Sequence, residues 1–305
     1  RRFRPTSGSE GRAVTAAGSD RPARIVAGSR RAAAASGPDG AHPATGARHA
    51  AVRPLPWLLP IALVLGLVYV VPMVEVVRLG LSDATLLRPA ESYGLGSFRA
   101  MLGSDPLGVI LRNTAVFTVA SVLGLQLAGL AVALLVTRGD RRGLPGMTVL
   151  RTVVLAAWVI PGIANGVIWQ TLLSEAPFGA VNSALALIGL PRVAWLSDPQ
   201  MAMVSAVLAN VWQGTAFSMI VFYAARSAIP ARLYEAAEVD GAGPVARFFF
   251  ITLPQLKGAI LVNTVLVTIQ TLNTFDAILA LTGGGPGRAT EVLSLHIFNT
   301  VFYNF

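Results

Sequence analysis

The sequence predicts an all-α protein that crosses a membrane several times. Charged residues make up only 13% of its 305 residues, and the mean hydropathy is +0.63. A helix needs roughly 20 apolar residues to cross the hydrocarbon layer of a bilayer. Five charge-free runs reach or approach that length: Leu55–Val74, Asn113–Thr137, Thr152–Ser174, Gln200–Ala225 and Gly258–Phe275. We therefore expect a polytopic membrane protein with five spans.

The basic residues predict which loops face the cytoplasm. Residues 1–54 hold ten arginines against three acidic residues, and residues 138–151 hold four arginines against Asp140 alone. Because excess Arg and Lys marks cytoplasmic segments, we expect both inside, and the order of the spans then places loop 226–257 inside as well. Three loops carry one more acid than base and are expected outside: 82–108, 175–199 and 276–292. The net charge of +9 thus reflects membrane topology, and we expect no nucleic-acid partner.

The two ends of the chain differ in composition. Residues 1–50 are rich in Ala, Gly, Arg, Ser and Pro and nearly lack large apolar side chains, so we expect a disordered cytoplasmic tail that cannot bury enough surface to fold. Residues 51–305 form one transmembrane domain in this interpretation, which includes the cytoplasmic loop 226–257.

Loop 226–257 has a defined pattern between two apolar spans. Pro230 suits the first turn of a short helix, where its missing amide would be unpaired. Asp240-Gly241 predicts the end of that helix, with Gly241 free to take a positive φ. Pro244 predicts the start of a second helix, and Pro254 its end before the next span. These features predict a helix–turn–helix elbow, which we define as residues 230–254.

Eleven specified positions within residues 235–254 resemble the EAA loop of the permease subunits of bacterial ABC importers, in particular the carbohydrate-uptake group. Residues 281–290 (LTGGGPGRAT) are similar to the loop before the final span of these permeases. The resemblance implies the ABC importer permease fold in the bacterial inner membrane, with a sixth span after Phe305. It also implies that six residues of the elbow couple the permease to its ATPase: Glu235, Ala236, Ala237, Asp240, Gly241 and Ala242.

The same resemblance implies the partners. These are a second permease subunit, two ATP-binding subunits that hold ATP and Mg²⁺, and an extracytoplasmic solute-binding protein. The chain itself offers no phosphate-binding loop around Lys257, its only lysine, and no His/Asp/Glu cluster with metal-ligand spacing. His296 has no carboxylate at a pairing distance along the sequence. As an ionisable group for ion-driven transport, the spans offer only Asp276, at an outer end. We therefore expect no enzymatic activity and no cofactor in this chain, with a secondary transporter as the weaker alternative.

The spans combine aromatic, amide and hydroxyl side chains, as a path for a sugar would. Pro161 introduces a break in the third span. By composition and by resemblance to the maltose-type permease, the candidate path residues are Trp158, Gly162, Asn210, Gln213, Gly214, Phe217, Gln270, Thr271 and Thr274. Two alternatives stay open: the polar groups act as interhelical hydrogen-bond partners, or the importer carries glycerol phosphate, polyamine or another small solute.

Overall fold

The computed structural model describes residues 55–84 and 88–303. The predictions for the tail, residues 1–50, lie outside the described residues. Contacts divide the chain into two units, Arg1–Leu59 and Pro60–Phe305. In the described part of the chain the regular elements are helices, with one isolated bridge between Ser82 and Tyr93. The predicted all-α class is confirmed.

The first helical stretch matches the first predicted span. It consists of α1 (Leu55–Leu65), a π turn (Gly66–Val70) and α2 (Val71–Gly80). Residues Trp57–Gly80 are long and apolar enough to cross a membrane, and none of this stretch is buried within the chain.

Three further helices match the second, fourth and fifth predicted spans, and each extends beyond its charge-free run at one end or at both. They are α4 (Leu107–Arg141), α8 (Pro199–Ser227) and the continuous stretch Pro244–Asn273. Arg138 and Arg141 lie in the last turn of α4, and Arg226 lies in the last turn of α8. Positive charge at a helix C-terminus is stabilised by the helix dipole, so the helices continue into these charged ends.

The third predicted span is broken. It forms α5 (Met147–Val159) and α6 (Gly162–Leu172), which are bent by 108° relative to one another. Ile160 (ψ 128°) and Pro161 (ψ 145°) are extended between them. The predicted break at Pro161 is confirmed, and it is far sharper than the bend of a kinked helix.

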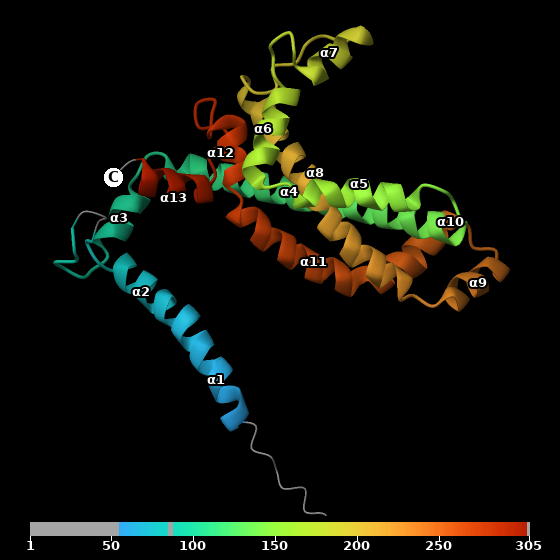
Figure 1. Ribbon diagram of the computed structural model, residues 1–305, viewed down its shortest axis with the longest axis horizontal. Helices are drawn as coiled ribbons and strands as arrows, with labels where there is room; N and C mark the ends of the chain where they lie inside the picture. Colours follow the sequence, from blue (N-terminus) through green and yellow to red (C-terminus); the bar gives the residue numbers. More distant parts are fainter. Residues whose placement is uncertain (1–54, 85–87, 304–305) are drawn as a thin grey trace, which may run out of the picture. The chain divides into compact units, whose positions relative to one another are not determined.

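The core is built on close approach of α4 and α8, which run side by side with α5 and α11 (Leu253–Asn273) (Figure 1). A Cβ added to Gly214 of α8 would lie 2.6 Å from Leu125 Cδ2 of α4, and a Cβ on Gly129 of α4 would overlap Ser218 of α8. Lipid tails are as apolar as Leu, so small residues that bring helices together are a main source of packing energy in membranes.

Shorter helices lie in the loops and at the end of the described chain. They are α3 (Gly96–Leu102), α7 (Ala180–Leu187), α9 (Ala231–Val239), α10 (Pro244–Arg247), α12 (Asp276–Thr282) and α13 (Leu293–Phe302). In Figure 1, α9 and α10 lie at one end of the helix group, whereas α6 and α12 lie beside each other toward the other end.

Candidate functional site

The elbow has the backbone that its sequence predicts up to Pro244. Pro230 (φ −58°) precedes α9, and Gly241 after the helix has φ +78°. The turn is closed by two backbone bonds, from Gly241 N to Glu238 O (3.1 Å) and from Ala242 N to Ala237 O (2.8 Å). A Cβ on Gly241 would meet nothing within 4 Å. Glycine is therefore required there by the positive φ and not by space.

The prediction that Pro254 ends the second helix is wrong. A π turn, Phe248–Thr252, joins α10 to α11, and the helix runs from Pro244 to Asn273 without a stop. The Leu253 N–H donates to Phe248 O, five residues back. A π turn is wider than an α turn, and it provides the local adjustment that a proline inside a helix requires.

Most predicted coupling residues lie at the surface of the elbow. Glu235, Ala236, Asp240 and Gly241 are exposed, and Ala237 and Ala242 are half-buried. Two side-chain contacts hold the elbow together. The Tyr234 hydroxyl lies 2.9 Å from Thr252 Oγ1, and Arg247 Nη1 lies 3.1 Å from Glu238 Oε2. The short helix α9 is thereby attached to the start of the long helix that follows.

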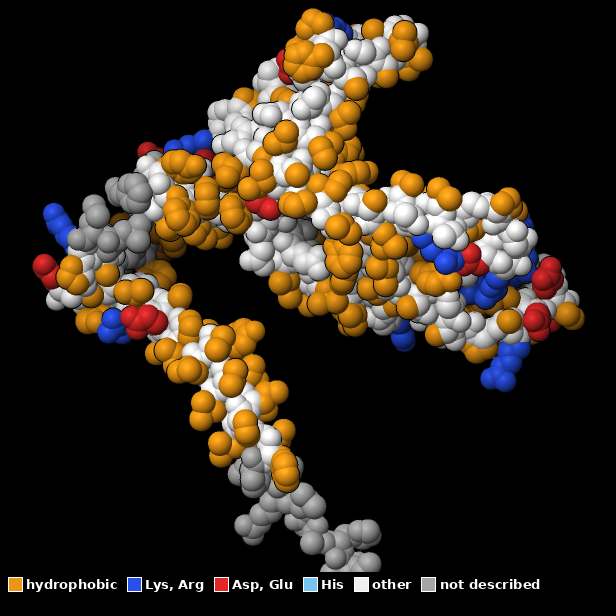
Figure 2. All heavy atoms as spheres, in the orientation of Figure 1, with side chains coloured by type: hydrophobic (Ala, Val, Ile, Leu, Met, Phe, Trp, Pro, Cys, Tyr) orange, Lys and Arg blue, Asp and Glu red, His pale blue; other side chains and the backbone are white. Residues whose placement is uncertain are grey.

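A cavity of about 630 Å³ lies between the elbow and the ends of α4 and α8. Its polar lining is dominated by arginines, and Figure 2 shows blue and red side chains gathered at this end of the helix group while hydrophobic side chains cover its middle. Sequence reasoning used these arginines only to orient the chain, because their convergence requires α4, α8 and the elbow to meet.

Among the predicted path residues, Trp158 and Phe217 form an aromatic pair. Their ring centroids are 6.2 Å apart, with Trp158 on α5 and Phe217 on α8. Trp158 is 46% exposed, and Gln270 on α11 is also exposed. These side chains are accessible to a solute or a partner helix.

Gln213, in contrast, makes two hydrogen bonds within the chain. Its Nε2 donates to Ile160 O (2.6 Å), and its Oε1 accepts from Asn165 Nδ2 (2.9 Å). Ile160 is the last residue before Pro161, where α5 stops. The side chain of Gln213 thus satisfies a carbonyl at the broken helix. Sequence reasoning missed Asn165, which is fully buried and donates as well to Ala209 O (3.3 Å).

The other path residues mainly pack or are enclosed. A Cβ on Gly162 would overlap the Asp276 carboxylate of α12, and Gly214 lies against α4. Thr271 is 3% exposed. The Thr274 hydroxyl donates to Gln270 O (3.1 Å), and Asn210 Nδ2 is enclosed without a hydrogen-bond partner among the described residues. None of the nine predicted path residues lines the cavity at the elbow or the second cavity, at the end of α6.

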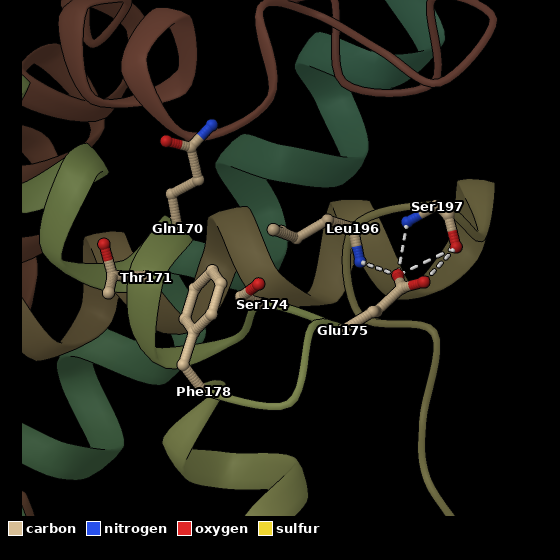
Figure 3. Close-up of a pocket in the computed structure, with 7 residues that line it drawn as sticks. All are labelled: Gln170, Thr171, Ser174, Glu175, Phe178, Leu196 and Ser197. Carbon is tan, nitrogen blue, oxygen red and sulfur yellow. Dashed lines mark hydrogen bonds between the residues drawn. The ribbon is translucent and has the colours of Figure 1, made fainter.

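The second cavity, of about 500 Å³, lies at the end of α6 (Figure 3). Glu175 accepts hydrogen bonds there from Ser197 Oγ (2.8 Å), Ser197 N (3.0 Å) and Leu196 N (3.3 Å). The Ser197 hydroxyl is the main cause that lowers the pKa of the Glu175 carboxyl below its ordinary value. In Figure 3, Gln170 and Phe178 line the same cavity without a hydrogen bond to Glu175.

The prediction that His296 lacks a carboxylate partner is wrong. Its Nδ1 lies 2.9 Å from Glu291 Oε1, and Arg288 Nε lies 3.5 Å from Glu291 Oε2. Glu291 precedes α13, which begins at Leu293, so helical spacing does not describe the pair. The loop is held in turn by Asn113 Nδ2 of α4, which donates to Arg288 O (2.7 Å).

Comparison with known proteins places these features in a family. Residues 126–304 match the model of the binding-protein-dependent transport system inner membrane component. The chain is 36% identical over 248 residues to the trehalose/maltose transport system permease protein MalF of Thermococcus litoralis, which covers 81% of this chain and 82% of that protein. It is 34% identical to the sulfoquinovosyl glycerol transport system permease protein SmoG of Agrobacterium fabrum, with 81% and 79% covered.

Solved structures agree. A bacterial ABC transporter involved in the import of the acidic polysaccharide alginate has a chain that superposes with a TM-score of 0.69 at 25% identity, covering 82% of this chain and 84% of that one. A chain of the alginate transporter in complex with its alginate pentasaccharide-bound periplasmic protein superposes with a TM-score of 0.68. The broken third span, the elbow and the matched region together show that this chain belongs to the family of binding-protein-dependent transport system inner membrane components, the multi-pass permease subunits of ABC importers.

Proposed function

We propose that this chain is one permease subunit of an ATP-driven carbohydrate importer. Its partners are a second, similar permease chain, two ATP-binding subunits that hold ATP and Mg²⁺, and an extracytoplasmic solute-binding protein. The chain catalyses no reaction itself in this proposal. Its N-terminus and elbow lie in the cytoplasm of the bacterial cell, as the arginine-rich segments favour.

The observation that carries the proposal is the construction of the elbow. The exposed helix α9 is attached through Tyr234–Thr252 and Arg247–Glu238 to a helix that continues unbroken from Pro244 to Asn273. A displacement of α9 is therefore transmitted directly to a membrane span. This is the mechanical connection that a permease needs if closure of a separate ATPase is to change the accessibility of its path.

A carbohydrate substrate is supported by the relatives and by one pair of side chains. The two relatives described above are permeases for trehalose/maltose and for sulfoquinovosyl glycerol, and the solved structures import alginate. Trp158 and Phe217 offer aromatic faces at the break of the third span, and such faces pack against the C–H faces of a sugar ring. Trp158 and Gln270 remain the candidates for direct contact, since both side chains are exposed.

The coupling half of the proposal is tested at Gly241. Gly241→Val should abolish uptake by the complete transporter and the stimulation of its ATPase by the loaded binding protein, because a β-branched residue resists φ +78°. Gly243→Val is the matched control. Gly243 lies in the same turn at φ −70°, and a Cβ there also meets nothing within 4 Å. Both variants should insert in the membrane, and full uptake by Gly241→Val would refute the coupling role.

The substrate half is tested at Trp158. Trp158→Ala should lower carbohydrate uptake at least several-fold while assembly and basal ATPase activity remain near normal. Val159→Ala is the control, because Val159 is the next residue, is 78% exposed and lacks an aromatic face. The sugar for this uptake assay is first identified by a binding screen on the cognate solute-binding protein. Equal uptake by both variants would remove Trp158 from the path.

A further inference from the structure

The cavity under the elbow has an unusual charge. Five arginines and two glutamates line it, contributed by α4 with the residue that follows it, α8, α9 and α10: Arg138, Arg141, Arg142, Arg226, Arg247, Glu235 and Glu238. The lining therefore carries an excess of three positive charges.

Little of this charge is neutralised within the described residues. Arg247 pairs with Glu238 at 3.1 Å. The nearby carboxylate of Asp140 is already engaged by Arg151 and by the Tyr223 hydroxyl (3.0 Å). In the part of the chain that the structure describes, no ion pair is formed by Arg138, Arg141, Arg142 or Arg226.

Arg226 is the most constrained of these side chains. It is 7% exposed, and its Nη1 is enclosed without a hydrogen-bond partner among the described residues. Its guanidinium lies over the Tyr234 ring at 4.2 Å, and that of Arg141 lies near the same ring at 5.6 Å. The Tyr234 ring thus holds two guanidinium groups at one side of the cavity.

Helix dipoles explain only part of this arrangement. They favour Arg138, Arg141 and Arg226 in the last turns of α4 and α8. They do not favour the enclosure of a guanidinium nitrogen with no acceptor, since a buried charge is costly unless it is hydrogen-bonded and paired. An anion in the cavity would supply the opposite charge and would accept hydrogen bonds from the guanidinium N–H groups that line it.

We propose that the cavity binds a phosphate group. Arginines recognise phosphate oxygens through paired N–H donors, and basic pockets at the cytoplasmic ends of membrane helices suit anionic lipid headgroups. The phosphate comes either from a phospholipid of the adjacent leaflet or from free phosphate. Only the lipid source rests on the proposed function, which places the elbow at the cytoplasmic surface. A phosphate in this position connects α9 to the ends of α4 and α8 and restricts the movement of the elbow.

The test compares three arginine variants in the complete, nucleotide-free transporter. Arg141→Gln removes an exposed lining charge, and Arg226→Gln removes the enclosed one. Arg232→Gln removes an exposed arginine of α9 that does not line the cavity and is the matched control. Arg141→Gln keeps the test informative if Arg226→Gln fails to fold.

Two arms separate the sources of phosphate. In the first, inorganic phosphate is titrated calorimetrically into the transporter in detergent. Phosphate sites on the ATPase subunits are the same in all variants, so they do not contribute to the differences between variants. In the second, retention of cardiolipin against phosphatidylcholine is measured by native mass spectrometry after reconstitution in vesicles that contain both.

A lipid source predicts that Arg141→Gln and Arg226→Gln lose cardiolipin retention by about ten-fold, the loss of one charge-assisted contact, with unchanged phosphate titration. A free-phosphate source predicts the same loss in the titration instead. The control should match the wild type in both arms. If Arg141→Gln equals the control in both arms, the site is refuted. A transporter that binds phosphate through Arg141 but imports no carbohydrate overturns the proposed function alone.

Discussion

Two prolines within apolar helices have opposite effects in this protein. At Pro161 the helix stops, and α5 and α6 are bent by 108°. At Pro254 the helix continues, and Pro244–Asn273 is a single stretch. The local sequences do not separate the two cases, because each proline lacks its amide donor and restricts the residue before it.

The difference lies in how the freed backbone groups are satisfied. At Pro254 the chain solves the problem locally, through the π turn and the bond from Leu253 N to Phe248 O. At Pro161 the solution comes from another helix, since Gln213 of α8 donates to Ile160 O and is held in turn by Asn165 of α6. At Pro161 a neighbouring helix thus supplies a donor to the carbonyl that the break exposes.

The largest expected effect concerns the packing that supports the second half of the break. A Cβ on Gly166 of α6 would lie 2.5 Å from Ala277 O of α12, and a backbone atom cannot move aside. Gly166→Val should therefore destabilise the folded protein by about 3 kcal/mol or more. Gly258→Val in α11 is the control. It makes the same change in helix propensity, but a Cβ there meets nothing within 4 Å, so this variant should remain folded. Midpoints of unfolding in a denaturing-detergent titration compare them, and equal midpoints would contradict the packing role.

The second effect tests the donor itself. Gln213→Leu leaves Ile160 O and Asn165 Nδ2 without their present partner, and we expect a loss of about 1–3 kcal/mol in the free energy of unfolding. Gln270→Leu on α11 is the control for the unfolding measurement, since Gln270 is exposed and its side chain forms no hydrogen bond among the described residues. If Gln213→Leu is as stable as the wild type but binds carbohydrate more weakly, the structural role is contradicted and Gln213 contacts the substrate instead.

The smallest effects are expected from the prolines themselves. Pro161→Ala should keep the break, because Gln213 and the packing of α6 on α12 remain. Pro254→Ala restores a donor to a helix that is already continuous. Each should change the free energy of unfolding by less than about 1 kcal/mol, mainly through the entropy of the unfolded chain. A Pro161→Ala variant destabilised more than Gln213→Leu would show that the proline determines the break.

The elbow illustrates how far local sequence reaches. Pro230, Gly241 and Pro244 give the predicted start, turn and restart, because each acts through its own φ and its own amide. The coupling residues Glu235, Ala236, Ala237, Asp240, Gly241 and Ala242 were all identifiable by pattern, and their coupling role stays a prediction. The arginine cavity behind them was not identifiable as a site, since its lining combines residues 134–142 with Arg226 and with the elbow.

The sequence by itself determined the all-α membrane class, four of the span helices and the turn at Gly241, and it marked Pro161 as the candidate position for a break. Those features depend on hydrophobic length, charge and the conformational limits of single residues. Tertiary structure alone decided the 108° bend, the pairing of His296 with Glu291 and the use of Gln213 within the chain. Each of these depends on which donor or acceptor a folded neighbour brings to a backbone or side-chain group, and sequence spacing does not contain that information.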